Sequence, residues 1–311
     1  MRVGVYAASG EENVEEVVDL VRAAAQAGLD SVWLSQVFGW DALTLAALAG
    51  REVPGIEIGT AVVPTFPRHP IALAAQALTA QAATGGRLSL GVGPSHRAII
   101  EGAFGLSYDR PARHTRAYLS ALGPLLRGEA VEYRGEALSA VGTIEVPGKV
   151  APPPVLLAAL GPAMLRIAGE LADGTVTTWA TPATIADDIS PRITEAARAA
   201  GRGAPRVIAG VLASVTGDPD RARGEIAERL GHASDLPSYR ALLDRQGLAG
   251  VADTALVGDE ETVAAGLRAY ADAGATDVLV SSTGSDAEET ARTFALLSAV
   301  RRDLNGQSAS A

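Results

Sequence analysis

The sequence contains no cysteine, so it can form neither a disulfide framework nor a thiolate metal site or nucleophile. No apolar run reaches about 18 residues, the length that a membrane-spanning helix needs. The opening residues MRVGVYAASG show no secretory signal. We therefore expect a cytoplasmic protein that does not contact membranes.

Positive charge is also scarce. Lys and Arg total 26 against 36 Asp and Glu, which gives a formal net charge of -10. A nucleic-acid-binding protein needs a basic face, so this balance opposes that role. The expected partners are small molecules or further copies of the same chain.

What the chain does contain is a regular alternation of strand and helix patterns over its 311 residues. Eight strands are expected to begin near Arg2, Ser31, Ile56, Arg87, Pro154, Gly174, Arg206 and Thr276. Nine helices are expected over 13–27, 41–50, 71–83, 113–126, 162–171, 183–200, 218–230, 260–273 and 286–302. Asn13 is placed to cap the first helix and Gly28 to end it. The repeat predicts an α/β fold, a (β/α)8 TIM barrel formed by one domain over 1–304, with a disordered tail over 305–311.

Two segments exceed the repeat and are interpreted as insertions after strands 4 and 7. The first, 129–153, reads as a short antiparallel hairpin formed by VEYRGEAL and TIEV. The second, 235–257, mixes helical and loop patterns. Insertions of this kind usually lie on loops at the barrel ends.

The chemistry of such a barrel lies at the carboxyl ends of its strands. Here those ends are neutral and rich in Gly, Ala, Ser and Thr, as in Gly91-Val92-Gly93 and Ser281-Ser282. They offer no set of carboxylates or histidines suited to a metal and no Ser/His/Asp arrangement. Small residues instead allow the backbone to approach a flat, bulky cofactor closely.

Two stretches carry a resemblance to a known family. GTAVVPTFPRHPIALAAQALTAQAATGGRLSLGVG and LAALGPAMLRIAGELADGTVTTW, in this order and spacing, resemble the luciferase-like flavin and deazaflavin oxidoreductases, and within them the branch that uses coenzyme F420. The resemblance covers about the first 220 residues and the last strand. It implies an enzyme, often a homodimer, with F420 as cofactor and FMN as the alternative.

The resemblance also implies positions for the cofactor. The third strand would end in a non-prolyl cis peptide against the ring at Ala61-Val62, whereas the plain alternative is an ordinary buried strand end. The turn Ala159-Leu160-Gly161-Pro162 looks like the family's phosphate-binding turn, a role that free N–H groups at a helix start support. Its alternative is a simple Gly-Pro helix start. The remaining expected cofactor contacts are Ser35, Gln36, Gly93, His96, Thr178, Trp179 and Thr181.

The chain departs from the family at two places. Many members end the second strand with Asp-His, where this chain has Ser35-Gln36, and relatives often carry Lys or Arg near Thr181, where this chain has Pro182. Gln36 can form hydrogen bonds to the ring or substrate but cannot move a proton. His96 is the best catalytic candidate, as an acid that protonates the substrate or as a residue that only forms a hydrogen bond. Trp179 is either a wall of the site or core packing.

The expected function is hydride transfer between F420 and a small organic substrate, with reduction of an activated C=C or C=O bond as the favoured direction. One alternative is an FMN-dependent monooxygenase of the same superfamily, which uses reduced flavin and oxygen. Another is a barrel that binds F420 without turnover. No metal is expected. Arg97, Arg110 and Arg113 are either contacts for the acidic tail of the coenzyme or solvated surface residues.

Overall fold

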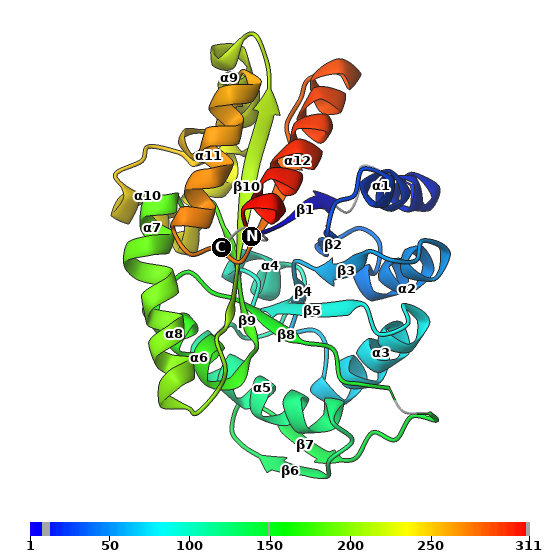
Figure 1. The fold of residues 1–311 in the computed structure, drawn as a ribbon. Coiled ribbons are helices and arrows are strands. Elements are labelled where there is room, and N and C mark those ends of the chain that lie inside the picture. Colours follow the sequence, from blue (N-terminus) through cyan, green and yellow to red (C-terminus); the bar gives the residue numbers. More distant parts are fainter. Residues whose placement is uncertain (8–12, 149, 309–311) are drawn as a thin grey trace.

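Eight parallel strands close into a barrel with the helices outside it (Figure 1). The computed structural model describes residues 1–7, 13–148 and 150–308. Each barrel strand is hydrogen-bonded to the next, and the last returns to the first. In order around the barrel they are β1 (Arg2–Ala7), β2 (Ser31–Leu34), β3 (Glu57–Thr60), β5 (Leu88–Gly93), β8 (Val155–Ala158), β9 (Gly174–Thr178), β10 (Arg206–Val215) and β12 (Asp277–Ser282). The predicted (β/α)8 barrel is therefore confirmed.

The outer helices follow the expected repeat. They are α1 (Val14–Gln26), α2 (Ala42–Glu52), α3 (Pro70–Ala83), α5 (Pro111–Leu126), α6 (Pro162–Leu171), α9 (Pro219–Leu230), α11 (Glu260–Asp272) and α12 (Ala287–Ser308). Between β9 and β10, α7 (Pro182–Thr184) continues through a π-helical turn, η1 (Ile185–Ile189), into α8 (Ser190–Ala199). Asn13 caps α1 by accepting a hydrogen bond from the Glu16 N–H, and Gly28 follows the helix with a φ of 74°. Both assignments from sequence are confirmed.

The first insertion contains the predicted hairpin, but the predicted position of its second strand was wrong. β6 (Val131–Arg134) pairs antiparallel with β7 (Ser139–Gly142), so the second strand precedes the predicted TIEV segment at 143–146. The chain turns more tightly than expected because the Gly135 N–H donates to the Leu138 carbonyl at 3.0 Å. A short helix that was not predicted, α4 (Arg97–Gly102), follows β5 directly.

The second insertion resolves into ordered elements. They are η2 (Gly231–Asp235), α10 (Pro237–Gln246), η3 (Val251–Thr254) and β11 (Leu256–Gly258), and β11 pairs with the upper part of β10. A further short strand, β4 (Val63–Pro64), pairs with β5. The last helix continues to Ser308, so the predicted disordered tail is helical over 305–308, and 309–311 lie outside the described residues.

The barrel interior is filled below its carboxyl end. Trp33, Leu156, Val176, Ile208 and Leu279 form its buried apolar cluster, beneath which Arg206 pairs with Glu57 at 3.1 Å and with Asp277. The apolar cluster and the ion pairs thus fill the lower barrel. Within the described residues, no helix is long and apolar enough to cross a membrane.

Candidate active site

The inward-facing residues at the carboxyl ends of the strands are almost all small. Side chains alternate across a strand, so Ala158, Thr178 and Ser281 face the same side as the interior residues Leu156, Val176 and Leu279 two positions earlier. Tyr6 and Ala61 pack directly on the interior cluster. The side chains that line the barrel mouth are thus mostly small, as the sequence indicated.

The segment Ala61-Val62 follows β3 at this mouth. Its peptide bond is cis, as the resemblance implied, and both residues are half-buried. The two glycines of β5 make room for the segment: a methyl group on Gly91 would meet the Thr60 carbonyl at 1.8 Å, and one on Gly93 would meet Val62 Cγ2 at 2.8 Å. The small size of Gly93 is therefore required by packing of the chain itself, whatever ligand lies above it.

The turn that precedes α6 is more open than the tightly packed glycines of β5. Ala159 is buried, Leu160 and Gly161 are half-buried, and Pro162 is exposed. A methyl group on Gly161 would meet no atom within 4 Å, and no side chain caps the helix at this residue. The backbone is thus open at a helix N-terminus, where N–H groups and the helix dipole attract anions.

A cluster of aromatic rings closes one side of the mouth. The Tyr239 ring lies 4.4 Å from the Trp179 ring and 4.9 Å from the His96 ring, measured between centroids. Trp179 has a φ of 59°, a left-handed conformation that is uncommon for a bulky residue and often marks a functional site. Tyr239 belongs to α10, so the second insertion supplies the central ring of this aromatic wall.

Polar contacts hold α10 against the strand ends. Gln246 accepts a hydrogen bond from the Thr181 N–H at 2.7 Å and donates to the Trp179 carbonyl at 3.1 Å. Arg245 donates to the Leu160 carbonyl at 2.9 Å. These contacts bring a cation to the turn at 159–162, near which the sequence had shown Pro182 in place of the Lys or Arg of relatives.

His96 is the titratable group next to this wall. Its Nδ1 atom lies 3.5 Å from Ser238 Oγ, and burial lowers the pKa of its imidazole from the ordinary value near 6.5. The same burial raises the pKa of Tyr239 to about 12 and, for Tyr6, raises the pKa above its usual value. At neutral pH all three side chains are uncharged.

Several side chains that were expected to contact the cofactor form hydrogen bonds within the protein. Ser35 is buried and forms a side-chain hydrogen bond with Tyr6. The Gln36 side-chain oxygen accepts a hydrogen bond from the Ala42 N–H at 3.3 Å, which ties it to the start of α2. Thr178 is half-buried, and Thr181 Oγ1 caps α7 by accepting from the Thr184 N–H at 3.4 Å. Gln36 and Thr181 thus have local structural roles.

The arginines considered for the coenzyme tail have acidic neighbours. Arg97 pairs with Glu101, and Arg113 pairs with Glu136 at 2.6 Å. Arg110 lies 3.7 Å from the same Glu136 carboxylate. These pairs favour the interpretation of the three as surface residues.

Sequence reasoning missed Ser238, Tyr239, Arg245 and Gln246. A signal for the helix PSYRALLDRQ was present, because Pro237 stands at its first position, where proline is typical. Nothing in that pattern says which end of the barrel the helix covers.

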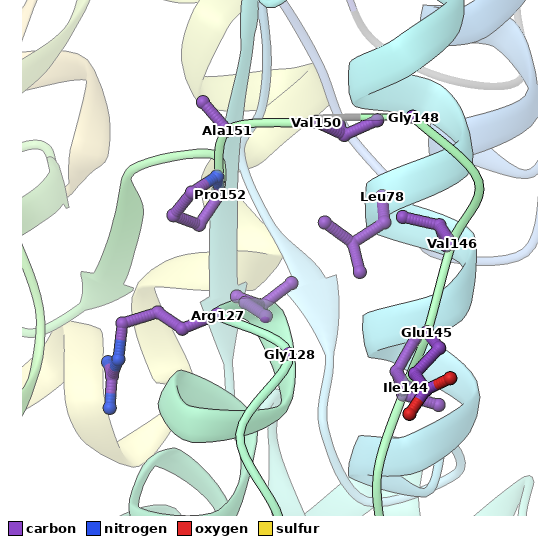
Figure 2. A pocket seen from close by; sticks show the side chains of 11 residues that line it. Leu78, Arg127, Gly128, Ile144, Glu145, Val146, Gly148, Val150, Ala151 and Pro152 are labelled. Carbon is purple, nitrogen blue, oxygen red and sulfur yellow. The ribbon is translucent and has the colours of Figure 1, made fainter.

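A groove of about 630 Å³ lies away from this site, at the opposite end of the barrel. It is bounded by Leu78 of α3, the end of α5 and residues 144–146, 148 and 150–152. Figure 2 shows Leu78, Ile144 and Val146 gathered beside α3, while the Arg127 side chain points away from them. Arg127 is paired with Glu129 at 2.7 Å, and Glu145 is the other charged side chain that lines the groove. Within the described ranges, no group of three His, Asp or Glu residues could hold a metal ion.

Several known proteins are similar to this chain in sequence. Relatives by sequence include a Mycobacterium tuberculosis protein provisionally named a coenzyme F420-dependent oxidoreductase, 31% identical over 56% of this chain and 53% of its own length. A 5,10-methylenetetrahydromethanopterin reductase of Methanolobus tindarius is 27% identical over 70% of this chain and 66% of its own. The F420-dependent glucose-6-phosphate dehydrogenase of Nakamurella multipartita is 29% identical over 72% and 70%.

Solved structures agree on the fold. The F420-dependent tetrahydromethanopterin reductase of Methanopyrus kandleri superposes with a TM-score of 0.80 at 23% identity, covering 96% of this chain and 97% of that one. The model of the luciferase-like monooxygenase family matches residues 1–277. The chain therefore belongs to the luciferase-like monooxygenase family, as its two sequence motifs indicated.

Proposed function

We propose that this protein is an F420-dependent oxidoreductase that transfers a hydride between the deazaflavin and a small organic substrate. The observation that carries the proposal is the barrel mouth: a floor of small residues around Ala61-Val62, bounded by the Trp179–Tyr239–His96 wall. Sequence similarity to several F420-dependent enzymes supports the choice of cofactor.

The residues fit such a cofactor at two places. The half-buried Ala61-Val62 segment offers an apolar surface for a ring, and the open turn at Gly161 offers backbone N–H groups for a phosphate. Arg245 adds a positive charge beside that turn. When bound, the deazaflavin supplies two-electron hydride chemistry, and the protein orients the reactants and excludes water.

His96 is the proposed proton-transfer residue. Its Nδ1 atom faces Ser238, which leaves Nε2 as the atom that exchanges a proton with the substrate oxygen or carbon. Reduction of a C=O or activated C=C bond needs the imidazolium as donor, whereas alcohol oxidation needs the neutral imidazole as acceptor. Because burial lowers the pKa of His96, the neutral form dominates at pH 7, and reduction is favoured at lower pH.

The alternative is an FMN-dependent monooxygenase, since enzymes with bound FMN share the fold at a TM-score of 0.74. Fluorescence titration of the protein with oxidised F420 and, separately, with FMN distinguishes the two. Micromolar or tighter binding of F420 alone supports the proposal, and preference for FMN would move the assignment to the monooxygenase. Binding of neither cofactor contradicts both. F420 binding with no turnover of any carbonyl, enone or alcohol would indicate a non-catalytic carrier.

A further inference from the structure

The residue before His96 has an uncommon backbone conformation. Ser95 has a φ of 61°, in the left-handed region, which is sterically unfavourable for any residue other than glycine. Such a conformation persists only where neighbouring contacts enforce it. The next peptide leads directly into His96, so whatever holds Ser95 also decides where the imidazole is placed.

A tyrosine from the loop after α4 supplies an enforcing contact. The Tyr108 hydroxyl donates a hydrogen bond to the Ser95 carbonyl at 2.7 Å. Burial raises the pKa of this phenol, so it remains protonated and a donor at neutral pH. The Ser95 carbonyl and the His96 nitrogen belong to one planar peptide unit. A hydrogen bond to that oxygen therefore orients the peptide from which His96 extends.

Other contacts hold Tyr108 in place independently of its hydroxyl group. Its backbone N–H donates to Glu101 Oε1 at 3.2 Å. Its ring lies 5.1 Å from the Phe66 ring, between centroids, and the Arg97 guanidinium lies 5.5 Å from the same ring. Replacing Tyr108 by Phe thus removes the hydrogen bond to Ser95 and keeps the ring that these neighbours contact.

The remaining contacts of His96 act on the chain after it and on its ring. The His96 carbonyl accepts hydrogen bonds from the Ile99 and Ile100 N–H groups, at 3.0 Å each. The ring lies against Ser238 and Tyr239 of α10. Tyr108 acts on the chain before His96, so it completes the support of the imidazole.

We propose that Tyr108 is a positioning residue for His96. Its hydroxyl holds Ser95 in the left-handed conformation, and this turn keeps the imidazole against Tyr239. The importance of this for catalysis rests on the proposed function, in which a substrate carbonyl carbon receives a hydride from the reduced deazaflavin and its oxygen takes a proton from His96 Nε2. Tyr108 itself exchanges no proton.

The pKa of His96 reports its position, because burial is the cause of its lowered value. On α4, Arg97 and Glu101 form an ion pair beside it. From α10, the Tyr239 ring faces the imidazole, and burial raises the pKa of this phenol to about 12. Tyr108→Phe changes none of these charges. A shifted pKa in that variant therefore reflects altered burial of the imidazole.

The test is an NMR pH titration of the full chain, without cofactor, containing ¹³C-labelled histidine. The His96 signal is assigned by its absence from His96→Gln. In Tyr108→Phe we expect the pKa of His96 to rise toward its ordinary value near 6.5, and the NOEs between its ring and Tyr239 to weaken. An unchanged His96 signal and titration in this variant overturns the proposal.

Tyr118→Phe is the matched control. The Tyr118 hydroxyl also donates to a backbone carbonyl, that of Arg68, at 2.8 Å, but this contact lies in the loop after β4. The control should leave His96 unchanged, and an equal change in both variants would contradict a specific role of Tyr108. Urea denaturation of both variants shows whether each is folded.

A second substitution tests the left-handed turn itself. Glycine adopts a positive φ without steric cost, so Ser95→Gly in the Tyr108→Phe background should return the pKa of His96 toward the wild-type value. No recovery would contradict the role of this turn.

The rate of ketone reduction by the cofactor-loaded protein is measured separately. Misplacement of His96 in Tyr108→Phe should lower this rate about tenfold to a hundredfold. A displaced His96 with an unchanged rate would support the positioning by Tyr108 and contradict the proton-transfer role of His96. Failure of the proposed function is thus distinguished from failure of this inference.

Discussion

The His96 ring lies 4.9 Å from the Tyr239 ring, which joins the end of the fourth barrel strand to a helix inserted after the seventh. This contact packs the Tyr239 ring against the imidazole of His96, the titratable residue of the site. Burial then lowers the pKa of the imidazole, so its protonation is tied to the position of α10.

Replacing His96 by Gln removes the proton donor while keeping a hydrogen-bonding side chain. For a ketone reduced by this protein, we expect the rate of reduction to fall about 10²- to 10⁴-fold. The wild-type rate should decline as pH rises through the lowered pKa of His96, and this decline should vanish in the variant. The exposed His232→Gln is the control. A pH profile unchanged in His96→Gln would show that another group moves the proton.

Gln246→Ala deletes both hydrogen bonds between α10 and the loop after β9. Each lost hydrogen bond leaves a backbone group without its partner. We therefore expect the free energy of local opening of α10 and Thr181, measured by amide hydrogen exchange, to fall by about 1–3 kcal/mol. F420 binding should weaken in parallel. Gln76→Ala, on the exposed face of α3, should change neither quantity. Unaltered exchange of α10 in the Gln246 variant would mean that apolar packing alone holds this helix.

Alanine substitutions at Gly93 and Gly161 should have different effects on the stability of the protein. At Gly93 the added methyl group meets Val62 Cγ2 at 2.8 Å and Ala158 Cβ at 3.0 Å, so we expect a loss of about 1–3 kcal/mol in the free energy of unfolding. At Gly161 it meets nothing within 4 Å and φ is -107°, so stability should stay constant or rise by up to about 1 kcal/mol. Urea denaturation measures both. A tolerated Gly93→Ala would show that the Val62 segment can shift.

His114 should make the protein sensitive to mild acid. Its buried ring stacks on Phe66 at 3.8 Å, and burial lowers the pKa of its imidazole to about 4. In the unfolded chain the same group takes up a proton near pH 6.5, so stability is lost as pH falls from about 6.5 to 4, by on the order of 2–3 kcal/mol.

In His114→Phe, the free energy of unfolding should depend less on pH than in the wild type, as measured by urea denaturation at pH 7, 5.5 and 4.5. His232→Gln, at an exposed position, should leave it unchanged. Glu289, with a pKa of about 2, contributes in a lower window: its stabilisation is complete above about pH 4.5 and is lost as pH falls toward 2. An equally steep loss in His114→Phe between pH 6.5 and 4.5 would assign the sensitivity to other groups.

The barrel itself was predictable because its signals are local. Buried parallel strands are recognised by their apolar runs, and helices by residues such as Asn13 and Gly28 that begin and end them. The hairpin failed at its second strand, because the register of a pair depends on the turn between the strands. The small residues at the strand ends, and the cis peptide at Ala61-Val62, were likewise anticipated from the sequence and its resemblance.

The sequence by itself thus determined the barrel, the place of its mouth and the neutrality of the strand ends. Only the tertiary structure decided what surrounds that mouth. Tyr239, Arg245 and Gln246 reach it because α10 packs against the loops that follow β5, β8 and β9, and no local pattern encodes such a long-range contact. The lowered pKa of His96 has the same origin, since burial depends on which distant residues cover the ring.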